Sequence, residues 1–592
     1  MAVPGPMPVA TPEPAPTDPC RIGGPGGGAT GHRGAARPRP RLTLGTVTSP
    51  DPDPPTTGAQ PHVHVRASDL SGCAHRLYKQ THTVAEVDWP EETPAVRRRR
   101  DGAADRRRAV AAVLAAETGQ GWVDVSRADD RVAATMAAVA AGADRIWGAT
   151  FAPIGRRAGG AELLIRDAER GGYLPVIVVN HKVTDPGRGA VTSPTGRWAP
   201  APDERRKVRS QPRDLLRLSH LTRMLQDLGF ASPQLRGGAI GFDADCLVVH
   251  DLGGEDGPLE TYDIRFAERL AVIDGQTATV PSRVAECANC PWWTDLGGLE
   301  GCQTVLGRAR DVSLVVRGAQ ATMLRTDRIT TIDRLAAWTG EAPEHWRGAG
   351  FDDAVLAARS WLADAPLARR TREVTIARAD VEVDVDMESF QEDGAYLWGT
   401  LTSVDGIDRG YKSFVTWDPL PTADEARSFA EFWAWLDRLR RQTVDSGRTF
   451  AAYCYSEQAE NKWLMASARR FSGLPGIPSQ QQIEEFIASD HWVDVLKAVD
   501  TNFVTPRGRG LKVIARLAGF DWRDAEAGGE ASMVWYREAV SGDGPEALAQ
   551  RRRLLEYNED DVQATRVLRE WMSSPQVESV PLADELPRSP IT

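Results

Sequence analysis

The sequence predicts a multidomain α/β protein, and three observations lead to that prediction. At 592 residues, the chain is long enough for about four domains of roughly 150 residues each. Its composition, 41% hydrophobic and 26% charged, is ordinary for soluble globular proteins. Short apolar strand patterns occur in both halves of the chain, together with amphipathic helical patterns, and such sequences build helices onto sheets.

Charge and targeting patterns exclude several classes of protein. The formal net charge of −11 excludes a histone-like polycation but still allows a basic groove on an acidic molecule. No stretch approaches about 18 consecutive apolar residues, so we expect no transmembrane helix and no membrane partner. The start, MAVPGPMPVATPEPAP, has neither the basic nor the apolar region of a signal peptide. Seven cysteines are too few and too uneven for a disulfide scaffold, which predicts a reduced, cytoplasmic setting.

Proline and glycine separate a tail from the folded part of the chain. Residues 1–60 contain 14 Pro and 10 Gly, so we expect a disordered tail there. The expected order after it is an α/β domain at 61–310, a small helical unit at 311–375, a second α/β domain at 376–575 and a disordered tail at 576–592.

The domain at 61–310 combines strand and helix patterns. The short apolar run YLPVIVV at 173–179 predicts a buried strand. From Pro212 to Leu228, leucines recur near helical spacing, which predicts an amphipathic helix. Short helical patterns such as VRGAQATMLRTDRITTIDRLAAW then predict the connecting unit.

Between 376 and 575 the order of elements is different. VEVDVDMESF, GAYLWGTLTSV and YKSFVTW predict three short strands separated by turn residues. A helix is expected from Asp424 to Val444, then a strand at TFAAYCYS, then mostly helices, ending with one from about Pro545 to Met572. This is the order of an RNase H-like α/β domain, which the pattern alone makes one candidate.

Two carboxylates stand out in the first of these strands. Asp386 and Glu388 are two residues apart, and because side chains alternate along a strand, both point to one face. Buried carboxylates without partners are costly, and a divalent cation removes that cost because Mg²⁺ and Mn²⁺ prefer carboxylate oxygens. The alternative is a solvent-facing edge strand that carries Asp384, Asp386 and Glu388 outward.

The last predicted helix contains Tyr557-Asn-Glu-Asp-Asp561. Tyr557 and Asp561 are four residues apart and therefore share one face of the helix. The carboxylate can ligate a metal ion while the phenol orients an attacking water. The alternative is that this acidic turn is solvated surface.

DVDMES and YNEDD together resemble the first and third motifs of the DnaQ-like DEDD exonucleases, in the variant whose third motif is Tyr-x-x-x-Asp. With YCYSEQAENKWL, HWVDVLKAV and GLKVIARLAGF in the expected order, about 200 residues resemble the YprB-type RNase H-like nuclease domain. The second motif of that type has a glutamate after a Tyr-x-x pattern. Glu457 fits it best, and Glu460 and Asp494 are the alternatives.

The resemblance implies a 3′–5′ exonuclease. Asp386, Glu388, Glu457 and Asp561 would hold two Mg²⁺ or Mn²⁺ ions, which stabilise the attacking and leaving oxygens of an in-line displacement at phosphorus. Tyr557 would orient the nucleophilic water. The 3′ polarity is implied by the family alone.

The segment GGAELLIRDAERGGYLPVIVVNHKVTDP places Glu162 one strand before Asn180 and Lys182. It resembles the RecB-like PD-(D/E)xK nuclease core, in which an acid and an acid-x-Lys on successive strands bind metal. The chain as a whole, over about 61–575, resembles the bacterial RecB-like nucleases that carry a C-terminal RNase H-like domain. Here Glu162 replaces the usual Asp and the neutral Asn180 replaces the second acid, so only Lys182 is unchanged. We therefore expect a catalytically degenerate site.

Two arginine runs lie upstream of that segment, and arginine-rich surfaces bind phosphates electrostatically. We therefore expect a nucleic-acid-binding surface here, against the alternative of a solvated helix face. The residues are Arg97, Arg98, Arg99, Arg100, Arg106, Arg107 and Arg108.

Four of the cysteines have an arrangement that indicates a metal site. Cys287-Ala-Asn-Cys290 is followed by Cys302, and Cys73 lies far upstream. This arrangement resembles that of the iron–sulfur RecB-like nucleases of the AddB type, which implies a [4Fe–4S] cluster. Zn²⁺ is the alternative, because four thiolates suit it too. The isolated cysteines, expected to be buried or inert, are Cys20, Cys246 and Cys454.

The sequence thus favours a metal-dependent nuclease that acts on DNA or RNA with an active site in 376–575. The alternative is a catalytically silent nucleic-acid-binding module with a structural metal cluster. No GxxxxGK[ST] signature occurs, so a helicase partner would have to supply any unwinding.

Overall fold

The computed structural model describes residues 64–83, 92, 94–209, 211–347, 350–526 and 528–588. The Pro- and Gly-rich segment 1–60 lies outside the described residues. Within the described part, none of the helices has both the length and the apolar character needed to cross a lipid bilayer. The secondary structure is mixed α and β, with several mixed sheets, which confirms the predicted class.

The N-terminal region is built on a mixed sheet with nine strands among the described residues. Its order is β2-β3-β4-β5-β10-β11-β7-β8, and β1 pairs with β4. The strands are β1 (Val65–Arg66), β2 (Trp122–Asp124), β3 (Arg145–Ile154), β4 (Arg157–Arg166), β5 (Tyr173–Val178), β7 (Ala190–Ser193), β8 (Ala201–Asp203), β10 (Arg236–Ile240) and β11 (Leu247–Asp251). A separate pair consists of β6 (Thr184–Pro186) and β9 (Arg206–Val208). β5, predicted from its apolar run, is buried along its whole length.

Helices cover both faces of this sheet. Neighbouring strand residues such as Leu163 and Leu164 belong to two different cores, because alternate side chains point to opposite faces. α5 (Pro212–Asp227) buries Leu218 and Leu221 in one core, as the leucine spacing predicted, and α3 (Pro94–Thr118) contributes to the other. The remaining helices are α1 (Ala67–Ser71), α2 (Ala74–His82), α4 (Arg131–Ala140) and α6 (Pro258–Ile273).

Short helices follow along the chain, as the sequence predicted. They are α7 (Cys302–Ala309), α8 (Gly318–Thr326), α9 (Ile332–Ala336) and α10 (Phe351–Leu362). Leu324, Ile332 and Leu335 are fully buried in a core that α8, α9 and α10 share.

The C-terminal region contains a five-stranded sheet in the order β15-β14-β13-β16-β17. The strands are β13 (Val381–Phe390), β14 (Gly394–Val404), β15 (Ile407–Val415), β16 (Phe450–Cys454) and β17 (Trp492–Asp494). β13 pairs antiparallel with β14 and parallel with β16, so it is an interior strand. The four predicted strands are confirmed, and β17 is one that the pattern did not predict.

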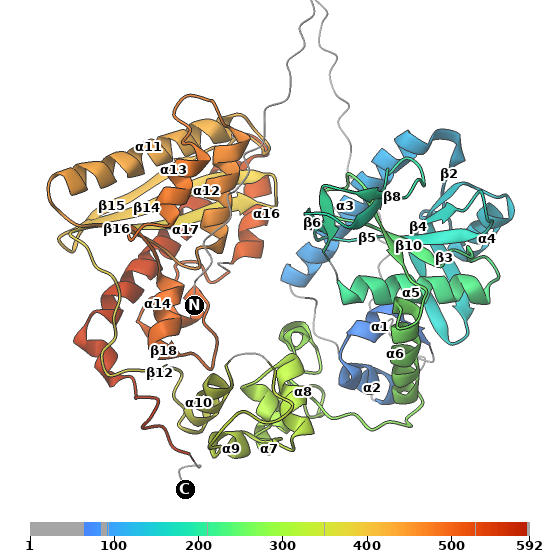
Figure 1. Ribbon diagram of the computed structural model, residues 1–592, viewed down its shortest axis with the longest axis horizontal. Helices are drawn as coiled ribbons and strands as arrows, with labels where there is room; N and C mark the ends of the chain where they lie inside the picture. Colours follow the sequence, from blue (N-terminus) through green and yellow to red (C-terminus); the bar gives the residue numbers. More distant parts are fainter. Residues whose placement is uncertain are drawn as a thin grey trace, which may run out of the picture. The chain divides into compact units, whose positions relative to one another are not determined.

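Helices also cover both faces of the C-terminal sheet (Figure 1). α11 and α12 share a core with Val383, Val385 and Met387, the odd-numbered residues of β13. The even-numbered residues point to α17, whose bounds agree with the prediction. The helices are α11 (Asp424–Asp445), α12 (Gln458–Arg470), α13 (Gln480–Ile487), α14 (Val495–Asn502), α15 (Leu511–Leu517), α16 (Gly529–Ala539) and α17 (Pro545–Met572).

The prediction of a disordered tail at 576–592 is wrong for residues 576–588. The chain continues after α17 through a short 3₁₀ helix (Pro575–Ser579) and then runs beside β12 (Ala368–Arg369). Ala583 N donates to Arg369 O at 2.7 Å, and Leu582 and Leu586 are each 5% exposed. These apolar residues are spread thinly through a polar segment, so composition does not reveal them.

Candidate metal centre

Four carboxylates lie on one face of β13: Glu382, Asp384, Asp386 and Glu388. Because β13 is an interior strand, the alternative of a solvent-facing edge strand is wrong. The helix that covers this face, α17, supplies the groups that these carboxylates meet. The two halves of the acidic row meet different partners.

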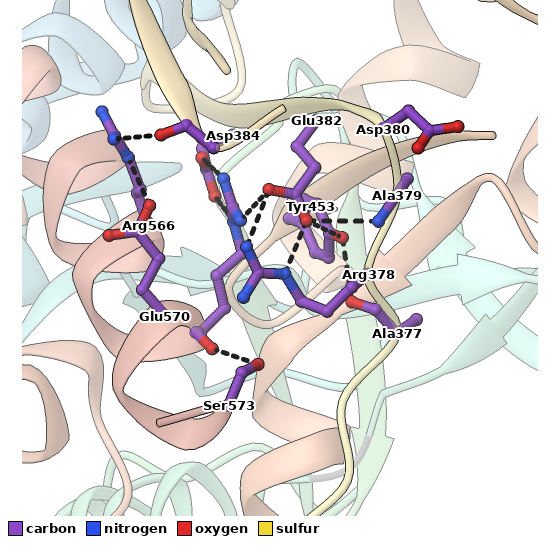
Figure 2. A network of polar contacts seen from close by, with 12 residues as sticks. Ala377, Arg378, Ala379, Asp380, Glu382, Asp384, Tyr453, Arg566, Glu570 and Ser573 are labelled. Carbon is purple, nitrogen blue, oxygen red and sulfur yellow. Dashed lines mark hydrogen bonds and ion pairs between the residues drawn. The ribbon is translucent and has the colours of Figure 1, made fainter. Parts of the chain in front are cut away.

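In the first half, Glu382 and Asp384 are bound by Arg569 of α17. Figure 2 shows the polar network to which Glu382, Asp384 and Arg378 belong. The Arg569 guanidinium donates to both oxygens of Asp384 at 2.9 and 2.8 Å and to Glu382 at 2.5 Å. None of the three side chains is more than 2% exposed. Arg378 also binds Glu382, and with Arg569 it lowers the pKa of that carboxyl to about 2.

In the second half, Asp386 and Glu388 meet Asp561 of α17 instead of an arginine. One carboxylate oxygen of each lies within 4.8 Å of the other two, and no other set of three or more potential ligand atoms in the described part of the chain is this close. Burial and the neighbouring carboxylates raise the pKa of Asp386 well above its usual range. Burial and the charge of Asp561 raise the pKa of Glu388 to about 8.

Side chains around the three acids fix their orientation. Asn558 donates to Asp386 Oδ2 at 2.7 Å, and Tyr411 donates to Asn558 Oδ1 at 2.7 Å. Trp522 donates to Asp561 Oδ1 at 2.6 Å, and Ser532 donates to Glu388 at 3.2 Å. The space for Asn558 comes from β14, because a Cβ at Gly399 would lie 1.6 Å from Asn558 Oδ1.

Tyr557 and Lys512 border the acids. Lys512 of α15 lies with its Nζ 3.4 Å from Tyr557 Oη and 4.6 Å from the centre of the Tyr557 ring. Burial lowers the pKa of Lys512, while Asp561, Glu388 and Asp386 oppose that shift. Burial and the three acids raise the pKa of Tyr557. The phenol therefore stays protonated and can hold a water or an oxygen by hydrogen bonding.

The three candidates for the second motif lie in different places. Glu457, just before α12, is ion-paired with Lys497 on α14. Asp494 caps α14 and accepts from Leu496 N at 2.9 Å and from Ser456 N at 2.9 Å. Glu460, in the first turn of α12, is 4% exposed, and burial with the charges of Asp494 and Glu388 raises its pKa to about 8.

Of the three candidates, Glu460 is the one whose carboxylate is engaged neither by an ion pair nor by a helix cap, and it therefore remains available to the metal centre. Its Oε2 is buried and has no hydrogen-bond partner in the described part of the chain. Its negative charge contributes to the raised pKa of Asp386. Glu460 lies outside the set of three acids within 4.8 Å, but its charge acts on Asp386 and Glu388. A hard cation would satisfy its buried oxygen, which lacks a donor, together with the three acids that each favour protonation. The donor set therefore fits Mg²⁺ or Mn²⁺.

The N-terminal sheet does not repeat this arrangement. Glu162 of β4 is contacted through Oε1 by Arg217 of α5, and by Arg107 of α3 at 3.5 Å. Asn180 follows β5 and is exposed, and neither it nor Lys182 bonds to Glu162 among the described residues. Both guanidinium groups contact Oε1 of Glu162, while its Oε2 is buried without a hydrogen-bond partner among the described residues.

The arginine runs on α3 are largely engaged within the molecule. Arg106 donates to the carbonyls of Gly241 and Phe242, which corrects its assignment to a nucleic-acid-binding surface. Arg100 pairs with Glu92 at 2.7 Å, and Arg108 pairs with Asp105. Arg97 is exposed, and the side chains of Arg98 and Arg99 lie outside the described residues.

The four expected cysteines line one cavity of about 10 Å³. Cys73 precedes α2, Cys287 lies in a 3₁₀ turn (Ala285–Asn289), Cys290 follows that turn, and Cys302 begins α7. Burial and the other three thiols raise the pKa of Cys302 to about 11. Cys73 N donates to Glu286 at 2.9 Å, which holds the two distant segments together. Cys246 and Cys454 are buried elsewhere, as expected, and Cys20 lies outside the described residues.

Comparison with known proteins locates one family in the chain. A family model described as RNase_H superfamily matches residues 468–573. The match contains Lys512, Tyr557, Asn558 and Asp561, and it begins after Asp386 and Glu388. No curated protein matches the chain, and no solved structure does. The C-terminal region therefore contains an RNase H superfamily domain.

Proposed function

We propose that this protein is a divalent-metal-dependent nuclease whose active site is the acidic centre of the C-terminal sheet. The observation that carries the proposal is the set of three carboxylates, Asp386, Glu388 and Asp561, within 4.8 Å of one another and without an arginine partner. The RNase H superfamily match, at 468–573, supports nucleic acid as the substrate. Its finer form is a 3′–5′ exonuclease, which follows from the resemblance of both motifs to the DEDD exonucleases.

Four acids would hold the metal: Asp386, Glu388, Asp561 and Glu460. Glu460 takes the place first given to Glu457, because Glu457 is paired with Lys497 whereas Glu460 keeps a buried oxygen free of donors. When bound, two divalent ions stabilise the attacking and leaving oxygens at phosphorus. Asn558 holds one oxygen of Asp386, so the other oxygen faces the centre.

Tyr557 and Lys512 act on the substrate side. The Tyr557 hydroxyl orients the attacking water by a hydrogen bond, since its raised pKa keeps the proton on the phenol. Lys512 provides a positive charge beside that hydroxyl, where it can attract a phosphate oxygen of the scissile nucleotide. Neither residue needs to lose a proton for these roles.

The N-terminal region is proposed to bind nucleic acid without cutting it. The RecB-like interpretation rests on the order of Glu162, Asn180 and Lys182 along β4 and β5. Neutralisation of Glu162 by Arg107 and Arg217 supports the view that the site is degenerate. The alternative function is a catalytically silent binding module, in which the C-terminal centre would be degenerate as well. Against it, the acids of that centre have no arginine among the described residues to take the place of the metal.

The cysteine cavity is proposed as a structural metal site of Cys73, Cys287, Cys290 and Cys302. Four thiolates suit both Zn²⁺ and a [4Fe–4S] cluster. The resemblance of the cysteine arrangement to the iron–sulfur RecB-like nucleases is what favours the cluster.

One assay tests the proposed function. Purified full-length protein is incubated with end-labelled single-stranded DNA and RNA in Mn²⁺, in Mg²⁺ and in EDTA. We expect metal-dependent shortening of the substrate from its 3′ end. Binding without cleavage in either metal would favour the silent module, and internal cuts would refute the exonuclease form alone.

A further inference from the structure

We propose that Arg569 is a positioning residue for the metal centre: it fixes the register of α17 against β13, so that Asp561 meets Asp386 and Glu388. The inference rests on the proposed metal centre. Arg569 makes no hydrogen bond or ion pair to the three acids of that centre; its acidic partners are Glu382 and Asp384, the other half of the acidic row.

The contact geometry of Arg569 is directional. Its fork donates through Nε and one terminal nitrogen to the two oxygens of Asp384, at 2.9 and 2.8 Å, and through the other terminal nitrogen to Glu382. A two-point contact of this kind is met in one orientation only. Its guanidinium also lies 4.6 Å from the ring of Tyr453 on β16.

Glu382, which accepts a hydrogen bond from Arg569, is itself held in place by hydrogen bonds from other residues. Glu382 accepts from Arg378 Nε at 2.7 Å, from Tyr453 Oη at 3.0 Å and from the backbone of Ala379 at 3.3 Å. Three elements of the chain therefore converge on the carboxylate that Arg569 binds. The arginine docks onto a fixed point of the sheet.

The distance from Asp561 to Arg569 along α17 is close to the distance between the two pairs of acids along β13. Arg569 lies eight residues after Asp561, a rise of about 12 Å along a helix. The middle of the Glu382–Asp384 pair lies four residues before the middle of the Asp386–Glu388 pair, about 13 Å along a strand. α17 runs opposite to β13, so docking of Arg569 at one end sets the position of Asp561 at the other.

A shift of register would dismantle the centre. Sliding α17 by one residue moves Asp561 by about 1.5 Å and turns it by about 100° around the helix. Apolar neighbours such as Leu554 and Leu568 tolerate small shifts, because dispersion contacts are not directional. Stability alone does not call for this arginine, since buried ion pairs are often replaceable by apolar residues.

The test measures Mn²⁺ binding as well as cleavage. Full-length Arg569→Met and Arg569→Lys are compared with the unchanged protein by calorimetric titration with Mn²⁺, and by the Mn²⁺ concentration that gives half-maximal cleavage, at a temperature where all are folded. We expect Arg569→Met to weaken Mn²⁺ binding by roughly 10- to 100-fold, the range for loss of residues that orient metal ligands. Arg569→Lys keeps the charge but loses the fork, so we expect an intermediate loss.

Arg566→Met is the matched control. Arg566 lies on the same helix and binds Asp408 on β15 at 2.6 Å and Glu570 on α17 at 2.8 Å, so neither of these ion-pair partners is on β13. We expect it to change the melting temperature but not Mn²⁺ affinity. Unchanged Mn²⁺ affinity in both Arg569 variants would overturn the inference.

A triple variant, Arg569→Met with Glu382→Gln and Asp384→Asn, covers the case in which Arg569→Met does not fold. It removes the three buried charges together and leaves only Arg378, whose side chain is 36% exposed, without its Glu382 partner. We expect the triple variant to fold and to bind Mn²⁺ more weakly than the unchanged protein. An affinity equal to that of the unchanged protein would show that the register of α17 against β13 does not depend on the Arg569 guanidinium. Absence of Mn²⁺ binding in the unchanged protein would instead refute the proposed function.

Discussion

Each of the two large sheets carries acidic residues that face a helix, but the helix residues that contact these acids differ between the two sheets. In the N-terminal sheet, Glu162 is met by two arginines, one from α5 and one from α3. In the C-terminal sheet, Asp386 and Glu388 are met by a third acid, Asp561. The first acid is paired with two arginines, whereas the three acids of the second arrangement have a single lysine, Lys512, beside them and keep an excess of negative charge that a cation would offset.

The comparison shows that an acid on a strand does not identify a metal site by itself. Even within β13, the same face carries Glu382 and Asp384, which Arg569 and Arg378 neutralise together. What distinguishes Asp386 and Glu388 is the residue that α17 places against them. The opposing helix, more than the strand, therefore decides which acids remain available to a metal.

The largest expected effect contrasts the two sheets directly. Asp386→Asn and Asp561→Asn each remove, at nearly constant volume, a carboxylate proposed to bind the metal, so we expect cleavage to fall by about 1,000-fold with the fold retained. Glu162→Ala should leave the rate within about two-fold. Single-turnover cleavage with circular dichroism as the folding check measures both. Equal loss in Glu162→Ala would make the N-terminal site catalytic and break the comparison.

A second prediction sharpens the C-terminal site. Glu460→Gln removes a buried carboxylate that has no donor, and we expect a loss of roughly 100-fold. Glu457→Gln, three residues earlier, breaks only an ion pair with Lys497 and should stay within about three-fold. Mn²⁺-dependent cleavage rates distinguish them. The reverse order of effects would return the second motif to Glu457.

The third prediction concerns protons. Glu388 and Glu460 have pKa values of about 8 without metal, so near neutral pH they must release protons when a cation binds. We expect Mn²⁺ affinity to rise from about pH 6 to about pH 8, by up to roughly tenfold per pH unit for each proton released. Calorimetry in buffers of different ionisation enthalpy counts those protons. An affinity independent of pH would contradict the raised pKa values.

Without metal the same two groups act on folding in the opposite direction. Their pKa values in the folded protein lie above the ordinary value of 4.5, so the unfolded chain loses these protons first as pH rises. Their contribution to stability is complete below about pH 4.5 and is lost as pH rises to about 8. Melting curves in EDTA and in Mn²⁺ should therefore diverge with increasing pH.

The smallest effect is confined to the N-terminal region. Cys287→Ser should abolish metal binding at the cysteine cavity. It should lower the melting temperature of that region by roughly 4–8 °C, which corresponds to a loss of about 2 kcal/mol in the free energy of unfolding, and leave the C-terminal region unchanged. Cys246→Ser, a buried cysteine outside the cavity, is the control for metal content. One equivalent of zinc without iron would overturn the iron–sulfur cluster, and no metal at all would remove the site.

The sequence predicted what is local in the chain. The two-residue spacing of Asp386 and Glu388 and the four-residue spacing of Tyr557 and Asp561 define shared faces wherever the strand and the helix lie. The strands and α17 followed from their patterns for the same reason. Cores such as that of α5 also follow, because leucines at helical spacing need one common partner surface.

The remaining features depend on contacts between distant segments. Lys512 gave no signal beyond its presence in GLKVIARLAGF, because its role arises from the position of α15 next to Tyr557. Glu460 and Glu457 differ only in where α12 begins and turns, which the motif pattern does not determine. The two arginines that contact Glu162 lie 55 residues before it and 55 residues after it in the sequence.

The absence of a side chain at Gly399 has an evolutionary consequence. Asn558 fits against β14 only because position 399 has no Cβ; an alanine there would place its methyl group 1.6 Å from Asn558 Oδ1. Neither residue can therefore change freely while the other stays. Among relatives of this protein, positions 399 and 558 should vary together, with a larger residue at 399 accompanied by a smaller one at 558. Such paired substitution would mark lineages in which Asp386 is oriented by some other donor.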